Sequence, residues 1–181
     1  MKNPIIERFE SLYGKLRDIN PEASSIEYSK ALRGFVLYGR EGKAVRWAAG
    51  KLPHALRNYE NGTWNINKWR KISRLLDILK ALPKRHSQKA VARLLDSRAA
   101  KSSENTSVRM KILETIEWCG ITAARELPRF AEEIKKAKHP RARSIVHDCI
   151  NVSRKIMSGR LQKKHKKELS GIIAKMEKMT K

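Results

Sequence analysis

The sequence predicts an all-α protein of about eight or nine helices in one or two helical bundles. Apolar residues recur at spacings of three and four along almost all of the 181 residues, and no stretch shows the strict alternation of a half-buried strand. Hydrophobic residues make up 40% of the chain, enough for a packed core. Asn, Gly and Pro residues divide this helical pattern into segments, which we take in order.

The first two predicted helices each begin at a capping residue. Asn3, followed by a proline suited to the first helical turn, starts a helix over 3–19. Ser24 and Glu27 have the spacing of a capping box at the start of the second, over 24–39. Both segments carry apolar residues at helical spacing, so each can pack one face on a core.

Prolines bound the next two predicted helices. The third runs over 42–52, where Pro53 is expected to kink or end it because proline lacks an N–H group. The fourth runs over 65–82, with Asn65 as its cap and Pro83 after it. Asn61-Gly62 is a predicted turn between them.

A polar run separates the two halves of the chain. A short fifth helix is expected over 87–95, and the residues after it are small and polar up to Ser107. We therefore predict an N-terminal helical lobe over 1–100, a linker or loop over 101–107, and a C-terminal lobe over 108–181.

The second half contains four more predicted helices. The first of them ends at Gly120, the next follows Pro128, the third ends at Gly159, and the last closes the chain. Their expected ranges are 108–119, 128–136, 140–158 and 161–179.

Positive charge is both large and unevenly distributed. The chain has 41 Lys and Arg against 18 Asp and Glu, a net charge of +23. Residues 62–101 carry +9 and residues 135–181 carry +12, while the rest is nearly balanced. A surface built only for solubility mixes both signs, so these two blocks indicate a polyanionic partner.

The candidate binding residues lie in these two blocks. On the fourth helix they are expected to project away from the apolar seam into water, and near the C-terminus they flank the helix break at Gly159. The predicted nucleic-acid-binding residues are Arg70, Lys71, Arg74, Lys84, Arg85, Lys89 and Arg93 in the first half, and Arg154, Arg160, Lys163, Lys164 and Lys167 in the second.

The function expected from these residues is non-catalytic binding of nucleic acid through its phosphate backbone. The ligand is RNA or single- or double-stranded DNA, since cations position a polyanion without reading its sequence. In size, charge and helix content the chain is similar to the small helical subunits that line the nucleic-acid channel of multisubunit CRISPR effectors. That similarity implies further protein partners in a larger nucleoprotein complex.

Three alternatives remain open at this stage. Gly39-Arg40-Glu41-Gly42 has the spacing of the loop with which KH domains hold a nucleic-acid backbone. Arg141 with His147, and Arg160 with His165, resemble the Arg-x(4–6)-His motif of HEPN ribonucleases, in which the His is the acid or base and the Arg stabilises charge. The third alternative is a helical adaptor for an acidic protein.

Other residue types point to no further chemistry. Cys119 and Cys149 have neither disulfide-framework nor zinc spacing, and the five histidines show no metal-binding pattern, so we predict no metal and no cofactor. Trp64 is a candidate base-stacking residue. No apolar run is long enough to cross a bilayer and the N-terminus lacks the pattern of a signal peptide, so we expect a cytoplasmic protein that does not bind membranes.

Overall fold

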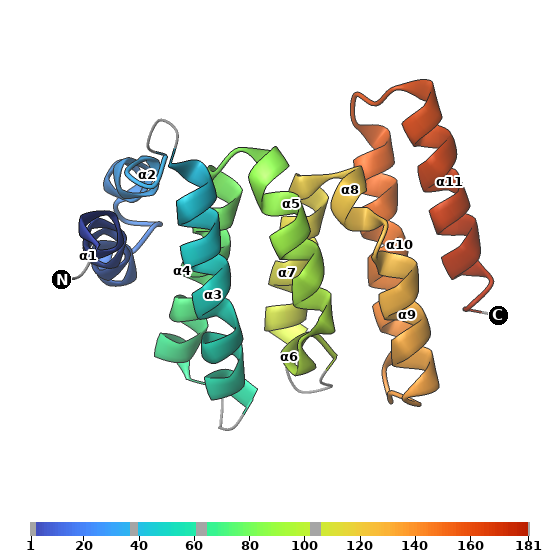
Figure 1. The fold of residues 1–181 in the computed structure, drawn as a ribbon. Coiled ribbons are helices and arrows are strands. Elements are labelled where there is room, and N and C mark those ends of the chain that lie inside the picture. The colour runs from blue at the N-terminus through green and yellow to red at the C-terminus, as the bar shows by residue number, and fades with distance from the viewer. Residues whose placement is uncertain (1–2, 37–39, 61–64, 102–105, 181) are drawn as a thin grey trace. The chain divides into compact units, whose positions relative to one another are not determined.

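The computed structural model describes residues 3–36, 40–60, 65–101 and 106–180 (Figure 1). Within these ranges every regular element is a helix, and nine of the helices are at least nine residues long. Two further α-helices and one 3₁₀ helix are only three or four residues long. The expectation of an all-α fold is confirmed.

Backbone contacts divide the chain into two compact units, Met1–Ala90 and Val91–Lys181. The sequence places a linker at 101–107 instead, where Lys101 ends one helix and Thr106 begins the next, with residues 102–105 outside the described part. The contact boundary lies earlier because the apolar residues that follow Ala90 belong to the core of the second unit.

The first unit is built around its fourth helix, which packs against each of the three helices before it. Phe9, Phe35 and Trp47 fill the space between these helices, with ring centroids 5.5–5.8 Å apart. Leu76 and Leu79 close the core from the fourth helix. The helices are α1 (Pro4–Asp18), α2 (Ser25–Arg33), α3 (Glu41–Glu60), α4 (Ile66–Ala81) and most of α5 (Lys84–Arg93).

The second unit is built around α10, which packs against α7, α9 and α11. Ile112, Phe130, Ile145 and Cys149 lie in its core, each almost fully buried. The elements are η1 (Leu94–Asp96), α6 (Arg98–Lys101), α7 (Thr106–Cys119), α8 (Ile121–Ala124), α9 (Leu127–Lys136), α10 (Ala142–Ser158) and α11 (Lys163–Glu177).

Several helix ends lie where their sequence signals place them. The Asn3 side chain accepts a hydrogen bond from the Ile5 N–H at 3.0 Å, and Asn65 accepts from the Asn67 N–H at 2.8 Å. Gly120 follows α7 with a φ of +84°, a conformation that favours glycine. These caps satisfy backbone groups that a helix end would otherwise leave without a partner.

Other helix ends differ from the expectation. The Ser24 side chain makes no capping hydrogen bond, and α2 ends at Arg33 rather than near Gly39, which lies outside the described residues, as does Asn61-Gly62. The third helix continues through Pro53, because Leu52 and Leu56 are buried on its core face while the proline ring is exposed. Packing outweighs the lost hydrogen bond there.

The fifth helix begins at Lys84, three residues before the expected Ser87, which lies inside the helix and packs against α4. The Ser87 side chain is fully buried and its hydroxyl donates to the Leu79 carbonyl at 2.8 Å, so this residue ties α5 to α4. The helix therefore begins at Lys84, directly after Pro83.

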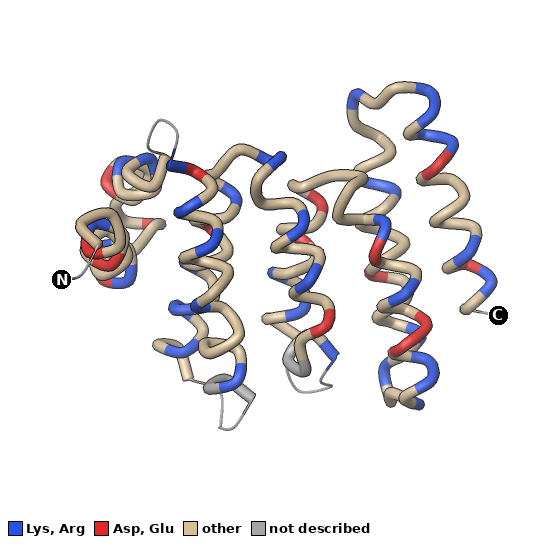
Figure 2. The backbone as a smooth tube through the Cα atoms, in the orientation of Figure 1, with Lys and Arg blue, Asp and Glu red and all other residues tan. Residues whose placement is uncertain are grey.

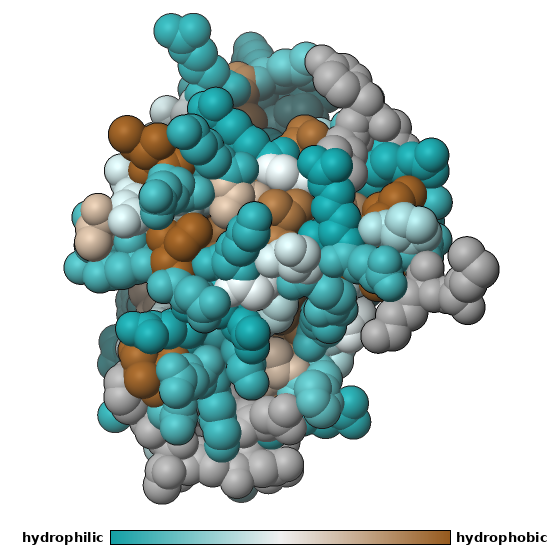
Figure 3. Space-filling model, turned by 90° about the vertical axis from the view of Figure 1, so that its left-hand side faces the viewer, coloured by the Kyte–Doolittle hydropathy of each residue, from teal (hydrophilic) through white to brown (hydrophobic). Residues whose placement is uncertain are grey.

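The face formed by α1 and α2 is mainly hydrophilic (Figure 3). Brown, apolar side chains appear there as separate spots with teal residues between them. Isolated apolar residues such as the exposed Ile26 are normal on a protein surface. The described residues of this face therefore form no continuous apolar patch.

Both cysteines are expected to resist modification in the folded protein. Burial raises the pKa of the Cys149 thiol to about 12, and Cys119 is also buried. Because the thiolate is the reactive form, a thiol reagent at about pH 8 should label the native chain at least ~100-fold more slowly than the urea-unfolded chain. Absorbance-detected labelling with and without urea measures this ratio, and equal rates would contradict the described core.

Candidate nucleic-acid interface

The first group of predicted binding residues lies on α4 and α5, and most of it is exposed. Arg70 and Lys71 are exposed on α4. Arg85 and Lys89 are exposed one turn apart on α5, and Arg93 follows after one more turn. Lys84 is exposed as well. These helices therefore carry cations on their solvent-facing sides, as the sequence predicts.

Arg74 is the exception, and its expected exposure is wrong. Its side chain is buried, with Nε donating to the Leu16 carbonyl at 3.1 Å and Nη2 donating to the Ile19 carbonyl at 3.3 Å. Both carbonyls lie at the C-terminal end of α1, where helix carbonyls lack intrahelical partners. The guanidinium also lies 4.7 Å from the centroid of the Tyr28 ring. Arg74 therefore joins α4 to α1 and α2 and is not available to a ligand.

The second group surrounds the turn between α10 and α11, where Lys and Arg appear on both sides of the turn (Figure 2). We call this cluster the basic turn. Its side chains are exposed, and no ion pair is recorded for any of them within the described part of the chain. The basic turn consists of Arg160, Lys163, Lys164, Lys166 and Lys167.

The basic turn concentrates positive charge where a helix disfavours it. Lys163 and Lys164 lie in the first turn of α11, which contains no acidic residue, and the N-cap residue Gln162 makes no side-chain capping bond. The N-terminal end of a helix already carries a partial positive charge, so cations there are repelled. An anion placed at this turn would relieve that repulsion and meet several N–H donors.

Arg154, which the sequence also places in this group, has a partner. Its Nη2 atom lies 2.7 Å from a carboxylate oxygen of Glu177, so it links α10 to α11. Both side chains remain about half exposed. Such a pair contributes little to stability, and the guanidinium is partly neutralised before any ligand arrives.

Most carboxylates of the second unit are likewise used to join elements. Arg129 on α9 contacts Asp96, Glu126 and Glu133 at 2.7–3.1 Å. The hydrogen bonds that the Arg129 guanidinium donates to these carboxylates raise the pKa of Arg129, so it is always charged. The cations of the basic turn are therefore distinct from the paired cations of α9.

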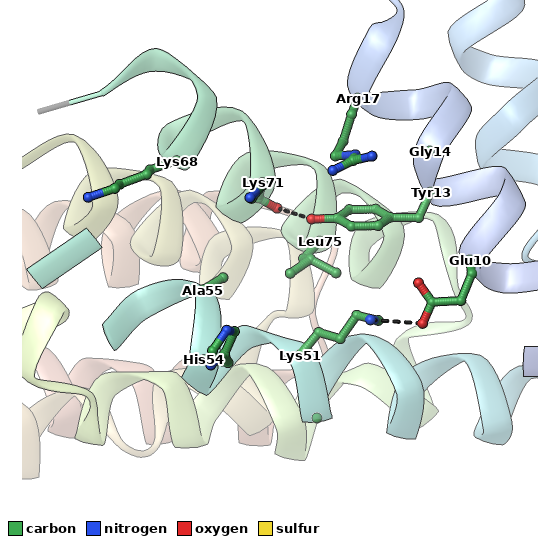
Figure 4. Close-up of a pocket in the computed structure, with 11 residues that line it drawn as sticks. Glu10, Tyr13, Gly14, Arg17, Lys51, His54, Ala55, Lys68, Lys71 and Leu75 are labelled. Atoms are coloured by element: carbon green, nitrogen blue, oxygen red, sulfur yellow. Dashed lines mark hydrogen bonds and ion pairs between the residues drawn. The ribbon is translucent and has the colours of Figure 1, made fainter. Parts of the chain in front are cut away.

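A groove in the first unit brings together cations that the sequence did not place together. It has a volume of about 790 Å³ and lies between α1, α3 and α4 (Figure 4). Only Lys71 among its lining residues belongs to the predicted set. Its other basic or imidazole side chains are Arg17 from α1, Lys51 and His54 from α3, and Lys68 from α4.

Glu10 is the single carboxylate of the groove, and it is already paired. The Lys51 ammonium lies 2.8 Å from Glu10 Oε1, which also accepts a hydrogen bond from the Trp47 ring N–H at 3.2 Å. Partial burial acts to raise the pKa of Glu10, but the hydrogen bonds from Lys51 and Trp47 outweigh it and leave the pKa below its usual value. The remaining cations lining the groove leave it positively charged.

The first of the two HEPN-like pairs does not lie on one face of its helix. Arg141 is the N-cap of α10 and His147 lies six residues later, about 120° around the helix axis. The Arg141 side chain donates to the Thr106 hydroxyl at 3.4 Å. In the second motif, Arg160 lies in the basic turn and His165 is half-buried on α11.

The KH-like motif and the candidate stacking residue lie partly or wholly outside the described residues. Gly39 and Trp64 fall there, while Arg40 is exposed and Gly42 lies within α3. A KH domain also needs a three-stranded sheet, and no described residue belongs to a strand.

The described residues lack two features, a metal-binding cluster and a membrane-spanning helix. No group of three or more His, Cys, Asp or Glu there is placed to hold a metal ion. Among the same residues, none of the helices has the length and apolar character that a bilayer crossing requires.

Comparison with known proteins adds no assignment. No protein-family model, curated protein or solved structure matches the chain. A functional proposal therefore depends on the residues described above.

The buried role of Arg74 can be tested by substitution. Arg74→Ala leaves two carbonyls of α1 and the Asp77 carboxylate without the guanidinium, and should lower the free energy of unfolding by about 3 kcal/mol. Arg70→Ala, one turn earlier and exposed, should change it by less than about 0.5 kcal/mol. Urea denaturation followed by circular dichroism measures both values, and equal effects would contradict the difference in burial.

Proposed function

We propose that this protein binds nucleic acid through the phosphate backbone, without catalysing a reaction. The basic turn carries the proposal, because its five cations gather at a helix start that lacks both a capping side chain and an acidic residue. Each phosphate neutralised there would release condensed counterions and favour binding. The exposed cations of α4 and α5 supply further contacts of the same kind.

The ligand of this proposal is RNA or DNA rather than an acidic protein. An acidic protein surface presents carboxylates on separate side chains at varied spacing, whereas a nucleic acid presents a continuous row of phosphates. Lysines on successive residues and turns, as in the basic turn, suit a row of charges better than one defined site. Membership of a larger nucleoprotein complex and a cytoplasmic location stay predictions.

Binding should depend steeply on salt and on the basic turn. Between about 50 and 200 mM NaCl, affinity for an RNA or DNA of mixed sequence should fall at least tenfold. Lys164→Glu should weaken binding to every sequence by about tenfold at low salt and reduce the slope of log affinity against log salt by roughly one. Fluorescence anisotropy with labelled oligonucleotides measures both quantities.

Lys30→Glu is the matched control for this substitution. Lys30 is exposed on α2, outside the groove and outside the predicted binding residues, and the change in net charge is the same. It should change affinity less than about threefold. No binding at low salt would contradict the proposed function, and RNA cleavage that disappears in His147→Ala would contradict its non-catalytic part.

A further inference from the structure

Two glycines lie in the interior of the helices that form the groove. Gly14 is in α1 and Gly50 is in α3, and both line the groove. Glycine in a helix interior costs about 1 kcal/mol relative to alanine. Neither glycine has a positive φ, and a Cβ atom at either position would meet no other atom within 4 Å. Neither backbone conformation nor packing therefore requires glycine there.

What the two glycines do provide is open space in the groove. A larger side chain at either position would project from α1 or α3 into the 790 Å³ volume. This volume lies within the range typical of small-ligand sites. At both positions the glycine makes its helix less stable, and at both positions it leaves the groove open.

The polar lining of the groove fits a phosphate group. Lys68 and Lys71 come from α4, and Arg17 comes from the facing end of α1 (Figure 4). The Arg17 guanidinium lies 5.5 Å from the Tyr13 ring centroid, and the Tyr13 hydroxyl donates to the Lys71 carbonyl at 3.3 Å. Tyr13 therefore links the segments that carry two of the three cations, and ordering them in advance lowers the cost of binding.

The groove also has apolar lining. Ala55 lines the side formed by α3, and Leu75, which is almost fully buried, lies below Lys71 and the Tyr13 ring in Figure 4. Cations beside an apolar surface match the two parts of a nucleotide, a charged phosphate and a flat base. Inorganic phosphate alone would leave the apolar part without a partner.

We propose that this groove holds one or two nucleotides of a single strand, with a phosphate against Arg17 and Lys71 and a base against the apolar lining. The inference rests on the proposed nucleic-acid binding and adds a preference for single strands. A single strand can turn a base outward into such a groove, whereas a duplex keeps its bases stacked inside. The exposed cations of the basic turn, by contrast, accept phosphates of either form.

Filling the groove without changing charge tests this proposal. Gly50→Leu, and separately Gly14→Leu, should weaken binding of a labelled single-stranded 12-mer about tenfold while binding of the matching duplex changes less than about twofold. The same variants should unfold at a temperature equal to that of the wild type or about 2–3 °C higher, because leucine favours the helix. A loss of affinity in a more stable protein cannot come from unfolding.

Gly171→Leu is the matched control. Gly171 is exposed in the interior of α11, far along the helix from its first turn, and a Cβ there meets no other atom within 4 Å. This variant should gain the same stability, and its single-strand affinity should stay within about twofold of the wild type.

The outcomes separate the groove from the wider function. If Gly50→Leu and Gly14→Leu bind the single strand as tightly as the wild type, the groove proposal is wrong while salt-dependent binding stands. Equal losses for single strand and duplex would overturn the preference for single strands. A nucleoside monophosphate that binds more tightly than the 12-mer would make a free nucleotide the occupant. If the wild type binds neither nucleic acid at low salt, both proposals fail.

Discussion

Eighteen carboxylates cannot neutralise 41 lysines and arginines, so the position of each carboxylate decides which cations stay available. In the second unit most of the described carboxylates pair with a cation of another element, as Asp96 does with Arg129 and Glu133 with Lys101. In the first unit Glu10 pairs with Lys51, and Asp77 lies beside Arg74 and accepts a hydrogen bond from Tyr28. The basic turn is what remains where carboxylates are absent. Its net positive charge therefore depends on the absence of unpaired carboxylates nearby as much as on its lysines.

The fold class and many helix ends could be predicted because their causes are local in the sequence. Asn3 and Asn65 cap helices through their own side chains, and Gly120 ends α7 through its own backbone conformation. The prediction that Pro53 would kink or end the third helix failed because the effect of a proline depends on how the helix around it packs. Burial of Leu52 and Leu56 holds α3 together across the proline, and no local pattern reveals how deeply those residues pack.

The candidate site divides in the same way. The basic turn is contiguous in sequence, so counting charges along the chain finds it. The groove is not, since Arg17, Lys51 and Lys68 come from three helices, and only the packing of α1, α3 and α4 brings them together. Arg74 was expected to be exposed because helical spacing places it one turn after exposed Arg70. Its guanidinium is buried instead, because it donates hydrogen bonds to carbonyls at the end of α1. Gly14 and Gly50 line the groove, but Gly171 also lies inside a helix and does not line it, so interior glycines alone do not reveal the groove.

The attachment of α11 has a consequence for how ionic strength acts on this protein. Among the described residues, three ion pairs join α11 to the rest of its unit, through Glu168, Lys175 and Glu177, and all of them are partly exposed. Electrolyte screens such pairs readily, yet each contributes little. The helix is held instead by Leu169, Ile173 and Met176, whose contact with the core is insensitive to dissolved ions. Adding electrolyte should therefore weaken the proposed polyanion binding at the start of α11 without detaching the helix from its core.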